Sequence, residues 1–578
     1  MKNNRYCTVK SLLRETADKK VILVDFFDTL VFRRIHSYQV YIPWAKALLN
    51  RIKMENVTAE QLVAFRRQAI STLRKDYAEP PYSLVMGKVY DALECSISKQ
   101  EFINNALEAD VAIELGCQYG NSHLIRFLRE AKKRGQKVYV VSDFYLPQSA
   151  YKDFLVNAGC EDVIDGVFVS EACNKTKSGG NIYPYVLECI GVSANDFVMF
   201  GDSRHSDVRQ AEKNGIQGMW YFPLKHKIWT NISRRLKLEY SKRIQSSLAG
   251  YLYKNTLFDE YALVLFAFAQ RLLIEAKKDG VRKLAFVSRG GYFLRLVLNE
   301  YLRSQGNDGI KTDYCYASRK VCLANDTEEV KTLKEYLASF IDNGKLVTVD
   351  EGWYCHSQQT ISKKSGLSTI GYYLGVRGKD DGYSDCERKG VLFDMFGNNG
   401  KPTKYYGIFC TNCSMYEQML TSREGSVKGY KKTNDGLQPV LKENEVEVKL
   451  YDEVIAHWQR RMMLIVKGLC AWKGTERVSE SLLARMILKT VLFANPSRCE
   501  MMNRLDRDMI NNCQSSKQVA KGVKDVKIDW LKLFVHPEMY LGMACKVQRR
   551  IYDRPLLNGA YKMLASGYYL YIRIMNRV

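Results

Sequence analysis

The sequence lacks a long apolar run, and no apolar segment lies near its start. The most apolar helical stretch, residues 261–269, is followed at once by Gln270 and Arg271, whereas a membrane-spanning helix needs roughly 20 apolar residues. The opening residues, MKNNRYCTVKSLLRET, contain no core that would serve as a secretory signal. Both absences count against a membrane-spanning or exported protein, so we expect a cytoplasmic location.

Regular cysteine spacing is also missing. The 16 cysteines are scattered through strand-like and helix-like segments, which is typical of reduced thiols rather than of a disulfide framework. Cys410 and Cys413 form a lone CxxC with no partner pair nearby, and a structural zinc site needs four ligands. We therefore expect neither disulfides nor a zinc site.

Acidic residues are outnumbered, with 63 acidic against 87 basic side chains and a formal net charge of +24. This excess favours an anionic lipid surface, nucleic acid or a phosphorylated substrate as partner. We find no helix-turn-helix or zinc finger, so nucleic acid is not expected. Near the C-terminus, basic residues alternate with apolar ones, as in an amphipathic segment on an anionic leaflet or in the solvated face of a helical domain. These basic residues are Lys546, Arg549, Arg550, Arg554, Lys562, Arg573 and Arg577.

The first 220 residues alternate strand-like and helix-like segments. Five apolar runs, KVILVDFF, QKVYVVSD, GVFVS, DFVMFGD and GMWYF, are separated by helical periodicity, which predicts an α/β fold with a parallel, doubly wound sheet. A helical insertion over about residues 34–116 interrupts the first crossover, and Thr58 with Gln61 forms a capping box at one of its helices. Such an insertion would cover the loop after the first strand as a lid.

A second strand-loop-helix pattern begins near Tyr251. A long apolar helix precedes the strand KLAFVSRGG, a helix over residues 292–302 and the strand KLVTVDEGW, and from Tyr451 the pattern is mostly helical. A chain of 578 residues allows two or three domains. We predict an α/β domain over residues 1–240, a second α/β domain over 241–445 and a helical, basic region over 446–578.

Polar residues follow four strands of the first domain, where ligands of open parallel sheets bind. They are DFFDTL at residues 25–30, Ser142-Asp143, the loop from Lys175 to Lys177, and GDSRHSD at residues 201–207. In this order the segments resemble the four motifs of the haloacid dehalogenase-like (HAD) superfamily: DxxxT[LV], a lone Ser/Thr, a Lys and GDxxxxD. The resemblance covers about 200 residues, and it implies a Rossmann-like core with a helical cap inserted after the first strand.

The resemblance also implies roles for single residues. Asp25 would be the nucleophile that attacks phosphorus, and Asp25 and Asp202 would hold Mg²⁺, which screens the charge of the substrate. Asp207 would complete the metal site by holding the second shell of the ion or a metal-bound water. Ser142 would donate a hydrogen bond to the phosphoryl group, and Lys177 would neutralise charge that develops during transfer. We prefer Lys177 to Lys175 because of its distance from the next helix, and we add Thr29 as a substrate-binding residue.

One position departs from the family pattern. Most phosphatases of the superfamily carry a second Asp two residues after the nucleophile, where it protonates the leaving oxygen, but this chain has Phe27. Only the backbone carbonyl of Phe27 could still ligate the metal. Loss of general acid catalysis typically costs about 10² to 10⁴ in rate. Asp28 is the candidate replacement; without it the domain would bind phosphate but turn over slowly.

The strings DxFDTL and SDxYLP resemble a HAD branch found in bacterial capsule and O-antigen gene products, which is often fused to glycosyl-transferring modules. Residues 250–440 are similar to such a partner module, of phosphoribosyltransferase type, through residues 286–294, 316–319 and 349–353. This similarity implies that Asp350 and Glu351 bind ribose hydroxyls and that the following loop, closed by Gln358, cradles a phosphate. Arg289 and Arg319 would hold a pyrophosphate.

Two features depart from that module. Its first loop usually reads RDG, whereas this chain has Arg289-Gly290-Gly291, and its phosphate loop is usually small, whereas this chain has bulky residues at 354–357. A plain strand-turn-helix with a half-buried Trp is the alternative interpretation of this segment.

The leading hypothesis is an Mg²⁺-dependent phosphatase of cell-surface polysaccharide synthesis. Phosphoribosyl transfer from phosphoribosyl pyrophosphate (PRPP) to a lipid-linked glycan would be followed by removal of the 5-phosphate, at the inner face of the cytoplasmic membrane. The alternatives are a sugar-phosphate phosphatase whose C-terminal half only binds glycan or membrane, and a catalytically degenerate basic scaffold.

Overall fold

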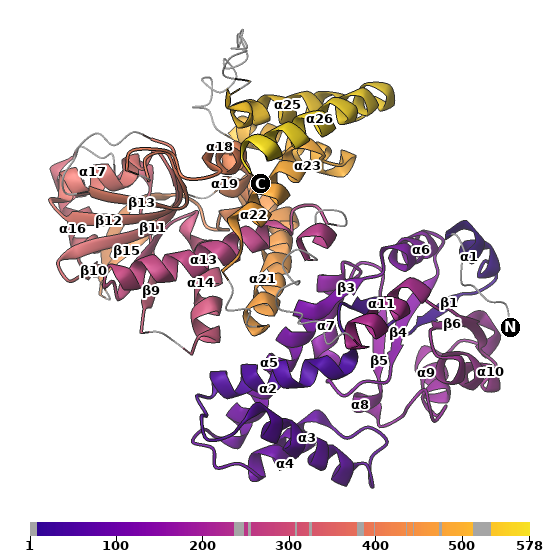
Figure 1. Ribbon diagram of the computed structural model, residues 1–578. Coiled ribbons are helices and arrows are strands. Elements are labelled where there is room, and N and C mark those ends of the chain that lie inside the picture. Colours follow the sequence, from indigo (N-terminus) through magenta and orange to yellow (C-terminus); the bar gives the residue numbers. More distant parts are fainter. Residues whose placement is uncertain are drawn as a thin grey trace. The chain divides into compact units, whose positions relative to one another are not determined.

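The computed structural model divides the chain into two compact units, each built around its own sheet (Figure 1). The first unit is Met1–Ile244 with two short pieces, Ser304–Gly306 and Lys467–Thr475, and the second is the rest of the chain. The expected boundaries at 240 and 445 stay predictions. The structure describes residues 9–235, 248–252, 256–306, 309–322, 326–378, 386–397, 399–434, 436–442, 444–472, 477–512, 533 and 535–577.

The sheet of the first unit is entirely parallel, with strand order β5-β4-β1-β6-β7. All side chains of β1 are buried, as expected for a parallel strand covered on both faces. The strands are β1 Val21–Val24, β4 Lys137–Ser142, β5 Gly166–Val169, β6 Phe197–Gly201 and β7 Gln217–Trp220. The helices outside the cap are α1 Val9–Glu15, α6 Ser122–Lys133, α7 Tyr151–Ala158, α8 Ser170–Cys173, α9 Ile182–Ile190, α10 Gln210–Lys213 and α11 Leu224–Arg235. The α/β prediction for this part is confirmed.

The helical cap lies between two short antiparallel strands, β2 (Val31–Arg33) and β3 (Gln118–Gly120). The capping box is confirmed, because the Thr58 hydroxyl accepts from the Gln61 N–H and the Gln61 side chain accepts from the Thr58 N–H. The cap helices are α2 Tyr41–Arg51, α3 Ala59–Leu73, α4 Tyr82–Asp91 and α5 Lys99–Cys117. The chain thus leaves the core directly after the loop that carries Asp25 and returns beside it.

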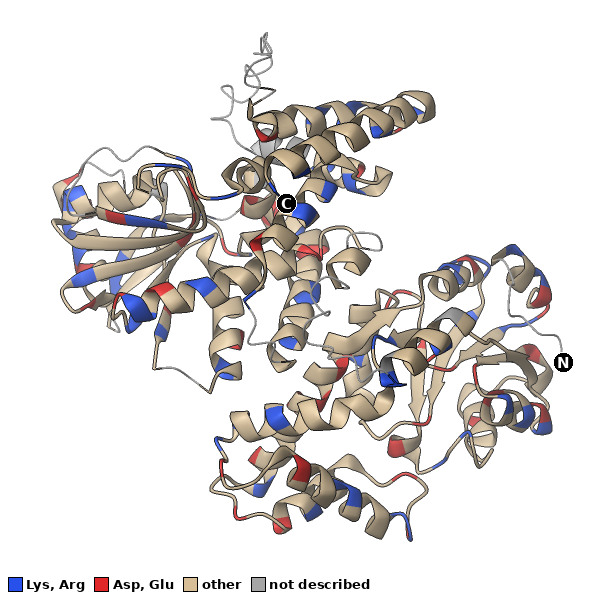
Figure 2. Cartoon of the chain, viewed as in Figure 1, with Lys and Arg blue, Asp and Glu red and all other residues tan. Residues whose placement is uncertain are grey.

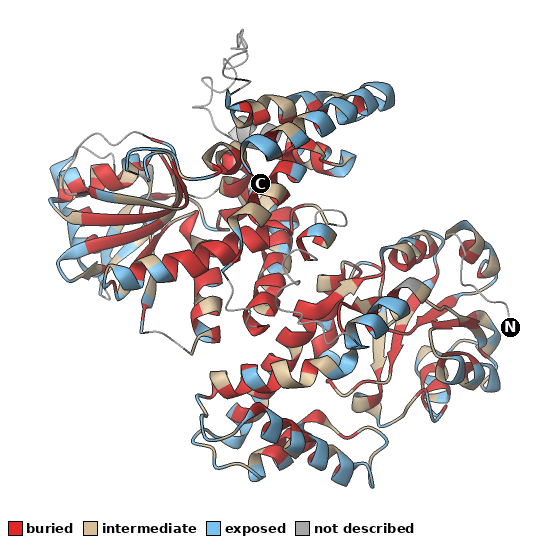
Figure 3. Cartoon of the chain, viewed as in Figure 1, coloured by how far each residue is buried: buried red, intermediate tan, exposed pale blue. Residues whose placement is uncertain are grey.

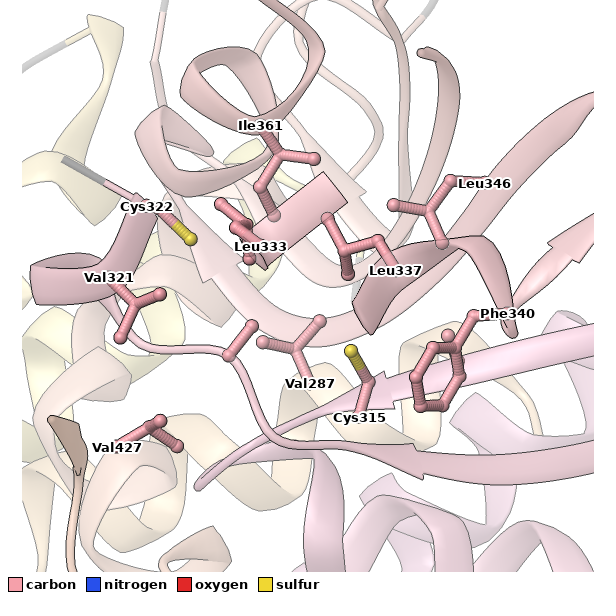
Figure 4. Close-up of a cluster of buried hydrophobic side chains, with 12 residues drawn as sticks. Val287, Cys315, Val321, Cys322, Leu333, Leu337, Phe340, Leu346, Ile361 and Val427 are labelled. Atoms are coloured by element: carbon pink, nitrogen blue, oxygen red, sulfur yellow. The ribbon is translucent and has the colours of Figure 1, made fainter. Parts of the chain in front are cut away.

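The second sheet has strand order β13-β12-β11-β8-β9, with these strands parallel and β10 antiparallel to β11. Its strands are β8 Lys283–Val287, β9 Lys311–Cys315, β10 Ile341–Asp342, β11 Lys345–Trp353, β12 Ser368–Val376 and β13 Cys386–Asp394. One face carries the apolar cluster of Figure 4, in which Leu333 and Leu337 of a helix pack on Ala285, Val287 and Leu346. The second α/β pattern expected from the sequence is therefore present.

Helices dominate the described chain after residue 446, as predicted. The helices after the first unit are α13 Tyr261–Lys278, α14 Gly291–Ser304, α15 Arg319–Cys322, α16 Thr327–Ala338, α17 His356–Ser365, α18 Tyr406–Phe409, α19 Cys413–Leu420, α20 Glu445–Leu450, α21 Ala456–Ala471, α22 Glu480–Leu492, α23 Pro496–Asn512, α25 Leu541–Ile551 and α26 Pro555–Met575. A hairpin of β14 (Val427–Thr433) and β15 (Gly436–Leu441) interrupts them. Within the described residues, no helix is long and apolar enough to cross a membrane.

Candidate active site

Three predicted site residues lie at neighbouring strand ends of the first unit. Asp25 follows β1, Ser142 ends β4 and Asp202 follows β6. Because β1 pairs with both β4 and β6 in parallel, their carboxyl ends meet at one edge. The Asp25 N–H donates to the Phe200 carbonyl at 2.8 Å, which extends the ladder to the nucleophile loop.

Asp25, Asp202 and Asp207 form an acidic cluster, in which one carboxylate oxygen from each lies within 4.8 Å of the others. Burial, together with the nearby carboxylates of Asp207 and Asp202, raises the pKa of Asp25 to about 8 against the opposing effect of Lys177. Burial also raises the pKa of Asp202. Carboxylates held this close are unfavourable unless a cation compensates their charge. Carboxylate oxygens are the ligands that Mg²⁺ prefers, so these residues fit a divalent cation.

Lys177, and not Lys175, reaches this cluster. Its buried ammonium donates to Asp25 Oδ1 and, at 2.7 Å, to Asp207 Oδ1. Although burial disfavours the charged form, Asp207 and Asp25 raise the pKa of Lys177 well above its usual range. Lys175 instead lies with its Nζ 5.9 Å from the Tyr185 ring. The sequence-based preference for Lys177 agrees with this geometry.

Asp143 positions the lysine loop, a role that was not predicted. Its two carboxylate oxygens accept from the backbone N–H groups of Lys177 at 2.7 Å and of Ser178 at 3.1 Å. The signal was present in the sequence, because Asp143 directly follows the motif residue Ser142. Thr29 has a similar supporting place, since its buried hydroxyl donates to Asp25 Oδ2 at 2.9 Å. It orients the nucleophile, whereas we had predicted it to bind substrate.

Phe27 packs into an aromatic wall. Its ring lies 4.2 Å from the Phe144 ring and 3.8 Å from the guanidinium carbon of Arg33. Arg33 is fixed in turn by a bidentate ion pair with buried Glu114, at 2.9 Å for both hydrogen bonds. At this side of the nucleophile the chain therefore offers an apolar ring and a guanidinium in place of a carboxylic acid.

Asp28 is held in an ionised form. Its backbone is left-handed, with φ 63°, and its carboxylate accepts from Lys227 at 2.7 Å and lies 3.1 Å from His226 Nε2. Burial would raise the pKa of Asp28, but His226 and Lys227 lower it well below its usual range. An anion held in this way is a poor proton donor, so the structure argues against Asp28 as the general acid.

His226 and Lys227 are contributed by α11 and were missed by sequence reasoning. Lys227 also lies 2.7 Å from Asp202 Oδ2, so one ammonium bridges Asp28 and Asp202. The His226 ring stacks on Phe32 at 4.3 Å. No motif marks these residues, because α11 follows the last strand of the sheet and only tertiary contact brings it to the site.

In the second unit, Asp350 and Glu351 lie near the end of β11, beside the loop after β8. These two strands pair where the strand order reverses, and such a switch point is where open α/β sheets bind ligands. Burial and the neighbouring Glu351 raise the pKa of Asp350 well above its usual range. Glu351 Oε2 is buried and has no hydrogen-bond partner among the described residues.

The same carboxylate explains the departure from the RDG pattern. A Cβ on Gly290 would lie 1.6 Å from Glu351 Oε2, so the space that an RDG aspartate needs is taken by Glu351. Glycine is the residue that fits here.

The other residues predicted in this unit are engaged elsewhere. Arg289 donates to Thr421 at 2.9 Å and to Glu447 at 3.0 Å. Gln358 is buried and donates to Thr369 at 3.1 Å and to the Glu387 carbonyl at 2.9 Å, which argues against its predicted place in a phosphate loop. Arg319 begins α15, and its side chain lies outside the described residues. Of the site residues predicted in the second unit, Asp350 and Glu351 are the two that lie at the switch point of the sheet.

The described cysteines are free thiols, and Cys413 donates to the Cys410 carbonyl at 3.1 Å. Among the described residues, the acidic cluster at Asp25 is the one group of three or more His, Cys, Asp or Glu side chains that lie close enough to share a metal ion.

Comparison with known proteins gives one family match. Residues 19–215 match the model of haloacid dehalogenase-like hydrolases, and no curated protein matches the chain. Solved structures that are similar include a 2-haloacid dehalogenase from Pseudomonas syringae pv. Tomato DC3000, with 18% identity over 36% of this chain and 87% of that one and a TM-score of 0.29. A HAD family enzyme from Bacteroides thetaiotaomicron, in complex with magnesium and inorganic phosphate, is 13% identical. The match covers 35% of this chain and 93% of that enzyme, with a TM-score of 0.25. A HAD phosphatase from Thermococcus onnurineus is 19% identical, and the match covers 35% of this chain and 85% of that phosphatase, with a TM-score of 0.26.

Proposed function

We propose that this chain, whose residues 19–215 match the model of haloacid dehalogenase-like hydrolases, is an Mg²⁺-dependent phosphatase in which Asp25 attacks the phosphorus of a phosphomonoester. The observation that carries the proposal is the acidic cluster of Asp25, Asp202 and Asp207 with Lys177 against it. Lys177 contacts Asp25 and Asp207, and the third carboxylate of the cluster, Asp202, lies within reach of the same ion position.

Each residue of the cluster has a defined part. Mg²⁺, held by the three carboxylates and the Phe27 carbonyl, would screen the charge of the phosphoryl group. Thr29 holds one oxygen of Asp25 and Lys177 the other, so the carboxylate is fixed before the substrate arrives. Ser142, at the tip of the neighbouring strand, would donate to a phosphoryl oxygen. Attack by Asp25 forms a carboxyl–phosphorus bond and breaks the ester bond, and water then releases phosphate.

The surroundings of Phe27 limit the leaving group. No acid stands at position 27, and Asp28 is held as an anion. An alkoxide leaving group would therefore leave without protonation from these residues, at a cost of about 10² to 10⁴ in rate. We expect aryl phosphates, whose leaving groups are weak bases, to be hydrolysed far faster than alkyl phosphates.

The finer proposal joins this activity to the second unit. We infer that Asp350 and Glu351 bind ribose hydroxyls of PRPP, and that the phosphatase acts on the ribose 5-phosphate group after its transfer to a surface polysaccharide. The support is the position of this pair at the switch point and the unsatisfied oxygen of Glu351, which a hydroxyl would satisfy. Calorimetric titration with PRPP should show binding to the natural protein and at least tenfold weaker binding to Asp350→Asn. Equal affinity would remove this part of the proposal.

The phosphatase is tested by phosphate release from p-nitrophenyl phosphate and ribose 5-phosphate with Mg²⁺. Asp25→Asn should abolish release from both, whereas the matched change Asp18→Asn, on an exposed carboxylate in a turn, should leave it unchanged. Equal release by Asp25→Asn and the natural protein would exclude Asp25 as the nucleophile. Absence of release from every preparation would favour the scaffold alternative.

A further inference from the structure

An apolar stripe on α26 is exposed at the surface of the second unit. The exposed fractions of Leu556, Met563, Leu564 and Ile574 are 90%, 78%, 75% and 73%. Leu556, Met563, Leu570 and Ile574 are separated by seven, seven and four residues, so they lie on one side of the helix. Figure 3 shows the exposed outer side of this helix in pale blue. Single exposed apolar side chains are ordinary, but a contiguous stripe marks an interaction surface.

The opposite side of α26 is packed against its own unit. Asn558, Ala565 and Ile572 recur every seven residues and are buried. The Tyr569 ring contacts the Phe493 ring at a centroid distance of 5.8 Å, and the Tyr568 hydroxyl donates to the Pro537 carbonyl. The helix is therefore held in place by one side, and the stripe faces away from the unit.

The charges on α26 itself are of one sign. α26 contains no acidic residue, and Lys562 and Arg573 lie along one flank of the stripe. The preceding helix α25 carries Arg549 and Arg550 in its last turn. Figure 2 accordingly shows α26 in blue and tan. A second copy of this surface would oppose like charges, whereas an anionic surface would complement them.

We propose that α26 docks on an anionic lipid bilayer. Its apolar stripe enters the boundary between headgroups and acyl chains, and Lys562 and Arg573 face the lipid phosphates. The packed side of the helix stays with the protein, so the attachment is peripheral. This surface lies on a different element from both candidate sites, and the proposal does not depend on either activity.

Vesicle flotation with the full chain tests the proposal. The natural protein should float with vesicles of phosphatidylcholine that contain 30 mol% phosphatidylglycerol, and binding should fall at least fivefold when NaCl is raised from 0.05 to 0.5 M or when the anionic lipid is omitted. The double variant Met563→Glu/Leu570→Glu should bind at least tenfold more weakly. Both positions are exposed, so the fold should be retained, which circular dichroism would check.

The double variant Ile274→Glu/Leu296→Glu is the matched control, because it places the same two charges on exposed apolar positions of α13 and α14. It should bind vesicles like the natural protein. Unchanged binding of the α26 variant, or an equal loss in the control, would overturn the proposal. So would concentration-dependent dimerisation without lipid that the α26 variant abolishes, since a second copy would then be the occupant of the stripe.

Discussion

Replacing Lys227 by Met should strengthen the binding of Mg²⁺. The ammonium lies 2.7 Å from both Asp28 Oδ2 and Asp202 Oδ2, so a divalent cation at Asp202 must displace one of these contacts and tolerate a positive neighbour. A hydrogen bond between charged groups is worth about 1.5–3 kcal/mol when buried. Here the Lys227 side chain is 24% exposed and that of Asp202 is 20% exposed. After allowance for solvent screening, we expect the contact between Lys227 and Asp202 to oppose Mg²⁺ binding by about 1–1.5 kcal/mol. About 1.4 kcal/mol corresponds to a tenfold change in affinity.

Calorimetric titration with MgCl₂ measures this change directly. The Kd for Mg²⁺ should fall about tenfold in Lys227→Met and stay unchanged in Lys175→Met, in which the removed ammonium contacts none of the cluster. Asp202→Asn should abolish the binding heat, which identifies the site that is being titrated. If Lys227→Met bound Mg²⁺ no better than the natural protein, the ammonium would not compete with the ion, and its place would be with the substrate phosphate instead.

Three further predictions concern residues that support the site. Asp143→Ala should lower kcat by about 10- to 100-fold with little change in Tm, because the lysine loop loses both carboxylate acceptors; full activity would show that the loop holds itself. Glu114→Ala should destabilise the fold by about 3–5 kcal/mol in urea unfolding, since it leaves the buried Arg33 charge unpaired, and adding Arg33→Ala should cost less than the sum of the single changes; strict additivity would speak against the pair. The low pKa of Asp28 means that its ionised form stabilises the fold at neutral pH and that this contribution is lost as the pH falls below the ordinary value of about 3.8. The Tm difference between the natural protein and Asp28→Asn should therefore shrink below about pH 4, and a constant difference from pH 7 to 3 would contradict the assignment.

The sheet and the acidic cluster were predictable because both follow from local patterns and one topological rule. Apolar runs identify the strands, and the carboxyl ends of parallel strands meet at one edge, so Asp25 and Asp202 had to come close. The spacing of the fourth motif placed Asp207 on the turn after β6. The N–H of Ser203, four residues earlier, donates to the Asp207 carboxylate at 2.9 Å, which directs this carboxylate back to the strand ends.

The contacts of Asp28 were not predictable in the same way. Its direction depends on a left-handed backbone that a non-glycine residue rarely adopts. Its partners His226 and Lys227 lie about 200 positions away in the sequence, on a helix that no motif identifies. Likewise, the sequence shows only that Gly290 replaces the aspartate of the RDG pattern. The structure adds the reason, because the pairing of β8 with β11 places the Glu351 carboxylate where a side chain at position 290 would lie.

The stack of Phe27 on Arg33 constrains how this domain could change over evolutionary time. A single mutation to Asp at position 27 would set a carboxylate beside a guanidinium, and the new group would remain deprotonated at neutral pH. Removing Arg33 first would strand the charge of Glu114 inside the protein. A descendant could therefore regain a proton donor at position 27 only through replacements at positions 27, 33 and 114 together, because the intermediate steps would be less active or less stable. Relatives that carry the ion pair of Arg33 and Glu114 are expected to keep the phenylalanine.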